Sequence, residues 1–188
     1  MPLPSTLNKI QSWKTEIQET TRAFREAFGK LSPEQLNMQP NPGVWSVAQI
    51  MDHLITINHT YYPMVEGIRK DTYKPPFHGR FPFIVNFLGN FILNSVEPER
   101  KRKIKTFPIW EPSQSQISGD IVTRFEKHQK ELAAWMESCG DLIDKRQVVH
   151  SPASKVIVYS LERAFDIITT HEKRHLNQAK ETFAMLKH

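Results

Sequence analysis

Residues 45–54 read WSVAQIMDHL, and this stretch predicts the beginning of a long helix. Ser46 and Gln49 have the S-x-x-Q spacing of a capping box, in which each residue satisfies a backbone N–H group of the other. Apolar residues then recur every three or four positions, which is the spacing of one buried helix face. They are Ile50, Leu54 and Ile57. We therefore expect a helix from Ser46 to about residues 67–70, kinked or shortened at Pro63.

The same periodicity predicts four long helices in the chain. Their expected ranges are 5–29, 46–70, 114–139 and 155–186. A short helix is expected over residues 82–94, because Pro82 suits the first helical position and the residues after it are mostly apolar. The segments between these helices are expected to be loops. The predicted fold class is therefore all-α: a four-helix bundle in a single domain, 1–188, with an extra short apolar helix in the middle connection.

Composition excludes several classes of protein. The chain has 188 residues, of which 39% are hydrophobic and 24% charged, so extensive disorder is not expected. The one cysteine, Cys139, excludes an intrachain disulfide and fits a reducing cytosol. The N-terminus lacks the features of a signal peptide, and the most apolar stretch, residues 81–93, is shorter than the roughly 20 residues of a transmembrane helix. We expect a cytoplasmic protein that does not associate with membranes.

The middle of the chain combines an apolar helix with a basic run. The expected 82–94 helix is apolar on nearly all sides, so we expect it to be buried on several of them, either over a pocket or in a homodimer interface. The net charge is +5, and five basic residues lie within residues 100–105. Such a run is usually a solvated surface, so nucleic-acid binding is not expected.

The histidines are the strongest candidates for a functional site. His171 and His175 are four residues apart, which places both imidazoles on one helical face, within reach of a shared metal ion. At about 100° per residue, this face is also the stripe expected to point into the core, whereas Glu172 points elsewhere. Buried imidazoles require polar partners or a metal ion. Ordinary hydrogen bonds and metal binding are both open from the spacing alone.

His53 supplies a third candidate, because it lies on the inward stripe of the expected 46–70 helix. His59 is turned about 120° away and is expected at the surface. Three neutral imidazoles from two helices would form an open site for zinc or a similar divalent ion. His128 also lies on an inward stripe. It is an additional candidate ligand or base, although a hydrogen-bonded core histidine is the simpler interpretation.

The stretch His171-Glu172-Lys173-Arg174-His175 also matches H-E-x-x-H, the signature of zincin metalloproteases. In such enzymes the glutamate is the general base. Zincins also need a third ligand further along the chain and a large domain that contains a sheet. The sequence indicates neither the third ligand nor the sheet-containing domain, so a zincin metalloprotease is the less favoured hypothesis.

Two motifs resemble those of the DinB-like (damage-inducible) superfamily. Residues 45–54 are similar to its W-S-x-x-[QE]-x-x-x-H-L motif, and residues 171–178 are similar to its C-terminal H-x-x-x-H-x-x-Q motif. The resemblance extends over about residues 5–186. It implies a four-helix bundle in which a divalent ion, zinc or nickel, is held by His53, His171 and His175. The family includes bacillithiol S-transferases and mycothiol-dependent maleylpyruvate isomerase, so a low-molecular-weight thiol is a candidate cosubstrate.

Two functions of different classes follow from these residues. The first is a metal-dependent enzyme, a thiol S-transferase or a hydrolase of a small molecule. In it Gln178, one turn beyond His175, would position a ligand or a water molecule. No residue identifies a general base. The second function is a non-catalytic helical module that binds a metal ion or a small ligand and homodimerises. The absence of an acid or base near the histidines would favour the second.

Overall fold

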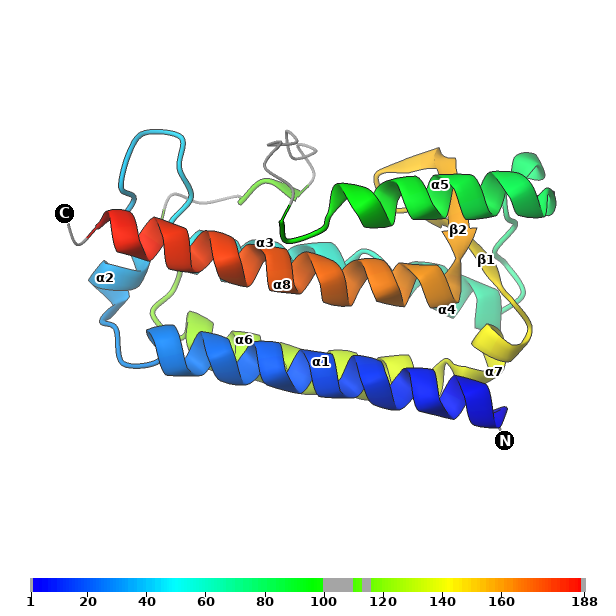
Figure 1. Ribbon diagram of the computed structural model, residues 1–188, viewed down its shortest axis with the longest axis horizontal. Coiled ribbons are helices and arrows are strands. Elements are labelled where there is room, and N and C mark those ends of the chain that lie inside the picture. The colour runs from blue at the N-terminus through cyan, green and yellow to red at the C-terminus, as the bar shows by residue number, and fades with distance from the viewer. Residues whose placement is uncertain (1, 100–109, 113–115, 187–188) are drawn as a thin grey trace.

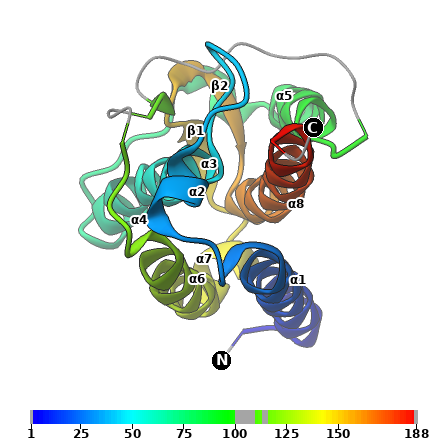
Figure 2. The ribbon, with the colours of Figure 1, turned by 90° about the vertical axis from the view of Figure 1, so that its left-hand side faces the viewer.

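The computed structural model describes residues 2–99, 110–112 and 116–186 of the chain. Three long helices and one shorter helix lie along the molecule and enclose its core (Figure 1). They are α1 (Pro4–Phe28), α3 (Val47–His59), α6 (Ile121–Ser138) and α8 (Leu161–Met185). Seen end-on, α5 (Pro82–Ser95) lies beside α8 at the edge of this bundle (Figure 2). The all-α expectation is confirmed, together with the extra short helix in the middle connection.

The beginning of α3 follows directly from the sequence around Ser46. The Ser46 Oγ atom accepts the backbone N–H of Gln49 at 3.2 Å, and the Gln49 Oε1 atom accepts the N–H of Ser46 at 3.0 Å. Both N–H groups would otherwise be buried without a partner. A second helix, α4 (Tyr62–Arg69), follows α3 and has Pro63 in its first turn. The predicted interruption at Pro63 is confirmed, because proline has no N–H group with which to continue α3.

The region before the last helix differs from the prediction. Residues 148–160 form an antiparallel hairpin of β1 (Val148–Ser151) and β2 (Ser154–Ser160), where the periodicity predicts a loop and the first turns of a helix. Both faces of β2 are covered near its end, because the neighbouring Val158 and Tyr159 are both buried. The helix begins only at Leu161, where the Ser160 Oγ atom accepts the N–H of Arg163 at 3.1 Å.

Three smaller differences concern helix ends. Helix α6 begins at Ile121 and not at residue 114; residues 113–115 lie outside the described part of the chain. Gly140 does not end the helical path, because α7 (Gly140–Asp144) follows α6 directly. Helix α2 (Pro33–Asn37) occupies part of a predicted loop, since Ser32 and Gln35 form a second capping box.

The core contains two clusters of buried apolar side chains. In one, Trp13 packs edge-on against Phe165, with ring centroids 5.2 Å apart, and donates its indole N–H to Asp166 at 2.9 Å. In the other, Phe24 packs against Phe125, with ring centroids 4.8 Å apart.

Cys139 is fully buried, and burial raises the pKa of its thiol to about 11. None of the described helices combines the length and the apolar content that crossing a bilayer requires.

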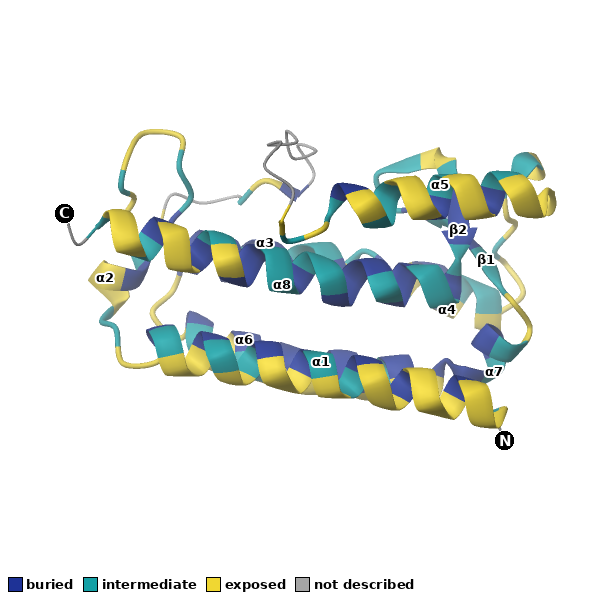
Figure 3. Ribbon diagram, viewed as in Figure 1, coloured by how far each residue is buried: buried dark blue, intermediate teal, exposed yellow. Residues whose placement is uncertain are grey.

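The short helix α5 matches its predicted range but not its predicted burial. One side of it packs on β2 and α8 and carries the buried residues Val85 and Gly89. The phenylalanines on the other side are exposed, as the colouring of α5 in Figure 3 also shows. The prediction of burial on several sides is therefore wrong within a single chain, and a homodimer interface stays a prediction. The basic run at residues 100–105 lies outside the described residues.

The close packing at Gly89 predicts a strong sensitivity to side-chain size. A Cβ atom at this position would lie 2.9 Å from the Cγ atom of Arg163 and 3.1 Å from the Cβ atom of Tyr159. Gly89→Leu should therefore push α5 away from β2 and lower the free energy of unfolding by about 1–3 kcal/mol. Urea unfolding measures the effect, with Ala134→Leu at an exposed position of α6 as the control. An unchanged midpoint for Gly89→Leu would contradict this packing.

Candidate metal centre

Three histidines from two helices meet between α3 and α8. His53 lies on α3, and His171 and His175 lie one turn apart on α8. Each offers one ring nitrogen, and these three nitrogens all lie within 4.8 Å of one another. The ring centroid of His53 is 4.7 Å from that of His175 and 5.4 Å from that of His171. The structure thus brings all three predicted residues together.

One hydrogen bond fixes the chemical form of His53. Its Nδ1 atom lies 2.7 Å from the backbone carbonyl oxygen of Trp110. Because a carbonyl oxygen only accepts, Nδ1 must carry the proton and donate it, which leaves the lone pair on Nε2. Histidines that bind metal ions are usually oriented in this way, by donating the other ring N–H to a carbonyl or carboxylate. Sequence alone does not reveal this partner, because every residue carries the same carbonyl group.

The two histidines of α8 are in direct contact. The Nε2 atoms of His171 and His175 lie 2.9 Å apart. Two lone pairs would repel each other at this distance, so the two nitrogens must share a proton or a cation. The indole of Trp45 covers one side of the group. The plane of the indole lies within 15° of the plane of the His175 ring, and the ring centroids of Trp45 and His53 are 4.9 Å apart.

Burial keeps the three rings uncharged. It lowers the pKa of His53 and lowers the pKa values of His171 and His175 well below the usual value. Repulsion from neighbouring rings and from the guanidinium of Arg174 lowers the pKa of both α8 histidines further. A hydrogen bond that the ring of His175 donates to the side-chain oxygen of Gln178 raises the pKa of His175, which places Gln178 beside that ring. Neutral imidazole is the form that binds metal ions, so the lowered pKa values are compatible with a metal site.

The chemistry of this donor set fits a divalent transition-metal ion. Imidazole nitrogen suits zinc, nickel, copper and iron, whereas magnesium and calcium prefer oxygen ligands. Three protein ligands leave at least one coordination position for a small molecule. Over residues 2–99, 110–112 and 116–186, this is the one group of three or more His, Cys, Asp or Glu side chains placed to hold an ion.

His128 does not join the three histidines. It is buried on α6, and its Nε2 atom lies 3.2 Å from the Nδ2 atom of Asn58. Its ring also packs edge-on against His59, which is exposed as predicted. Burial lowers the pKa of His128 to about 4, with a smaller contribution from repulsion by His59. The structure therefore places His128 in a separate polar group, as a hydrogen-bonded histidine of the core.

Glu172 belongs to this second polar group. The sequence indicates only that Glu172 points away from the histidine pair, but the structure buries it almost completely. Its Oε1 atom accepts hydrogen bonds from Asn58 on α3 at 2.9 Å and from Gln129 on α6 at 2.8 Å. Burial raises the pKa of this carboxyl group to about 7 against the effect of both bonds. A carboxylate held by these amides does not occupy the position of a zincin general base, so the zincin alternative has no support.

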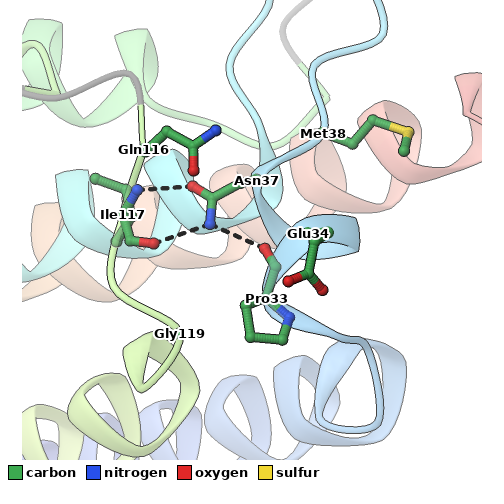
Figure 4. Close-up of a pocket in the computed structure, with 7 residues that line it drawn as sticks. All are labelled: Pro33, Glu34, Asn37, Met38, Gln116, Ile117 and Gly119. Carbon is green, nitrogen blue, oxygen red and sulfur yellow. Dashed lines mark hydrogen bonds between the residues drawn. The ribbon is translucent and has the colours of Figure 1, made fainter.

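A surface hollow of about 380 Å³ lies between α2 and the segment that leads into α6 (Figure 4). The side chain of Asn37 joins its two walls: it donates to the carbonyl oxygen of Ile117 at 2.8 Å and accepts the N–H of Ile117 at 2.7 Å. The seven described residues that line the hollow do not include the three histidines. It is therefore separate from the histidine site, and Asn37 serves to hold the chain segment that precedes α6.

Two comparisons with known proteins give a match, one to a family and one to a single protein. The sequence profile of the DinB superfamily matches residues 16–179, a range that includes all three histidines. The uncharacterized protein YuaE of Bacillus subtilis (strain 168) is 29% identical over 152 residues, which cover 80% of this chain and 85% of that protein. No solved structure matches the chain.

The raised pKa of Glu172 predicts a pH-dependent stability. The folded pKa of about 7 exceeds the unfolded value of 4.5, so the stability that this group contributes is complete below the unfolded value and is lost as pH rises through 7. Glu172→Gln keeps an acceptor for Asn58 and Gln129 and removes the charge. It should therefore stabilise the protein at about pH 8, by up to about 3 kcal/mol, and have little effect at about pH 4.5.

Thermal unfolding with a chelator present, at both pH values, measures this difference without a contribution from bound metal. Glu181→Gln, at an exposed position of α8, is the matched control and should have no pH-dependent effect. A variant Glu172→Gln that is destabilised at about pH 8 would contradict the account of this carboxyl group.

Proposed function

This chain belongs to the DinB superfamily, and we propose that it is a divalent-metal-dependent enzyme that acts on a small molecule by thiol transfer or hydrolysis. The proposed ligands are His53, His171 and His175, and the proposed ion is zinc or nickel. The observation that carries the proposal is the hydrogen bond from His53 Nδ1 to the carbonyl oxygen of Trp110. It holds the ring in the form whose Nε2 atom is available to an ion, beside two further neutral imidazoles, of which His175 is buried and His171 partly buried.

The chain's own residues prepare the site for an anionic nucleophile. A bound divalent ion lowers the pKa of a thiol or water that binds to it, and so supplies such a nucleophile near neutral pH. Burial keeps the three imidazoles neutral, and the indole of Trp45 shields one side of them from water. Gln178, beside His175, is proposed to orient that ring or a polar group of the substrate.

A low-molecular-weight thiol is the proposed cosubstrate. The resemblance to bacillithiol S-transferases supports it, and so does the donor set, because zinc and nickel both bind thiolate well. Cys139 is buried with a raised pKa, so the chain's own thiol is not suited to act as the nucleophile. The proposed compartment is the cytoplasm, where small thiols are kept reduced.

A non-catalytic module that binds a metal ion or a small ligand is the second candidate. One observation favours it: among the described residues, no carboxylate joins the three histidines as a proton acceptor. The buried carboxylate next in sequence, Glu172, is held by amides from α3 and α6. Turnover separates the two candidates, because a binding module would hold the ion without accelerating any reaction.

Loss of either histidine on α8 should remove bound metal and turnover together. His171→Ala or His175→Ala deletes one of three ligands, so metal content measured by elemental mass spectrometry should fall to the background level. Transfer of bacillithiol, glutathione or coenzyme A to monochlorobimane should be lost in the same variants. Gln178→Ala should retain the ion and lower turnover by about 10- to 100-fold, the usual effect of a residue that supports a ligand.

His150→Ala is the matched control, because His150 lies on β1, outside the three-histidine group, and the variant should keep both metal and turnover. Chelation should lower the melting temperature without unfolding the chain, since the bundle has its own apolar core. Full metal occupancy without turnover of any thiol or hydrolysable ester would contradict the proposed enzyme and favour the non-catalytic binding module. Undiminished metal content in His171→Ala would refute the proposed ligand set.

A further inference from the structure

An apolar surface lies on α5 and on the residues that lead into it. Five phenylalanines form this surface, here called the phenylalanine face. They are Phe77 (69% exposed), Phe81 (41%), Phe83 (70%), Phe87 (69%) and Phe91 (58%). Neighbouring rings are in contact, with centroids 5.7 Å apart for Phe77 and Phe81 and 6.1 Å apart for Phe81 and Phe83. Soluble single chains rarely expose so many clustered aromatic rings without a partner that covers them.

The packing of α5 prevents this face from turning inward. The opposite side of the helix is seated on β2 and α8, and at Gly89 there is no room even for a methyl group. At the C-terminal end, the guanidinium of Arg174 on α8 donates to the carbonyl oxygen of Ser95 at 3.0 Å. The rotation of α5 is therefore fixed by contacts along its length. The phenylalanine face therefore stays exposed while the opposite side of α5 is packed.

The chemistry of this surface is self-complementary. Helix α5 carries no charged residue over its 14 positions. Phe83, Phe87 and Phe91 follow one another at intervals of four, and the exposed residues Asn86 and Asn90 lie beside that row with the same interval. An asparagine amide both donates and accepts, so two copies of the face can pair rings with rings and amides with amides. No like charges on the two helices would oppose each other in such a pair.

The exposed area is close to what a dimer needs. A fully exposed phenylalanine offers about 200 Å², so at these exposures the five rings present about 600 Å². A stable interface of standard size covers about 800 Å² on each partner. A membrane surface is a poorer match, because helices that lie on membranes carry lysine and arginine on their polar side and α5 carries neither.

We propose that the phenylalanine face is the interface of a symmetric homodimer, in which α5 packs antiparallel against α5 of a second copy. A two-fold axis would pass near Phe87, the middle of the three evenly spaced rings. Each ring then fills space against the other copy's helix: Phe87 lies next to its own counterpart, and Asn90 lies near Asn86 of the second copy. The interface is independent of the proposed activity, because it uses none of the residues of the histidine group.

Sedimentation equilibrium over a range of protein concentrations tests the proposal. The unmodified chain should be a dimer at micromolar concentration. Phe87→Lys places two like charges near the axis and should give a monomer with an unchanged helix content by circular dichroism, because Phe87 contributes little to the core of its own chain. Leu7→Lys is the matched control: it introduces the same charge at a half-exposed apolar position of α1, and the variant should remain a dimer.

A cysteine substitution tests the position of the axis. Phe87→Cys, at the axis itself, should form a disulfide between two chains under mild oxidation, since Cys139 is buried and does not compete. Thr123→Cys, at an exposed position of α6, should not. A monomer at all concentrations up to about 100 μM would overturn the proposal. A dimer that persists in the Phe87→Lys variant would also overturn it. A monomer that binds vesicles of phosphatidylcholine and phosphatidylserine through this face would do the same.

Discussion

The packing of three uncharged imidazoles between α3 and α8, with His53 and His175 buried and His171 partly buried, is the constraint on which the rest of the structure depends. Polar groups that leave water must find partners, and here much of the surrounding chain is arranged to supply them. The carbonyl oxygen of Trp110 reaches His53 from a segment far along the sequence. Further along the chain, Ile117 is held by two hydrogen bonds with Asn37 of α2. Helix α2 thus holds the segment that precedes α6, while its Leu36 packs in one of the two apolar clusters.

Neighbouring residues of α8 satisfy two different polar groups. His171 contacts His175, whereas Glu172 is turned by about 100° and receives the amides of Asn58 and Gln129. Any rotation of α8 would break both sets of contacts at once, so the two groups together fix the orientation of the helix. The second polar group holds α3, α6 and α8 together without using the candidate ligand atoms.

The parts of the fold that sequence predicts well are those coded locally. The capping box at Ser46 and Gln49, the proline in the first turn of α4 and the four-residue interval of His171 and His175 depend on residues within one or two turns of each other. What sequence does not show are partners from distant segments. The burial of Glu172 depends on Asn58, 114 residues away, and the orientation of His53 on a backbone carbonyl. The hairpin before α8 is missed because a short run of valine and isoleucine fits a strand and a buried helix turn equally well. For α5 the sequence predicts too much burial, because the helix carries more apolar residues than one chain can cover.

The measurement that tests the central claim most directly is X-ray diffraction from crystals of the protein purified without a chelator, with data collected on both sides of the zinc and nickel absorption edges. The account predicts a single anomalous peak at about 2.0–2.2 Å from one nitrogen of each of His53, His171 and His175. It also predicts that His53 still donates its Nδ1 proton to Trp110 when the ion is bound. Crystals soaked in zinc and nickel that show no peak between these rings, or a peak bound elsewhere, would contradict it.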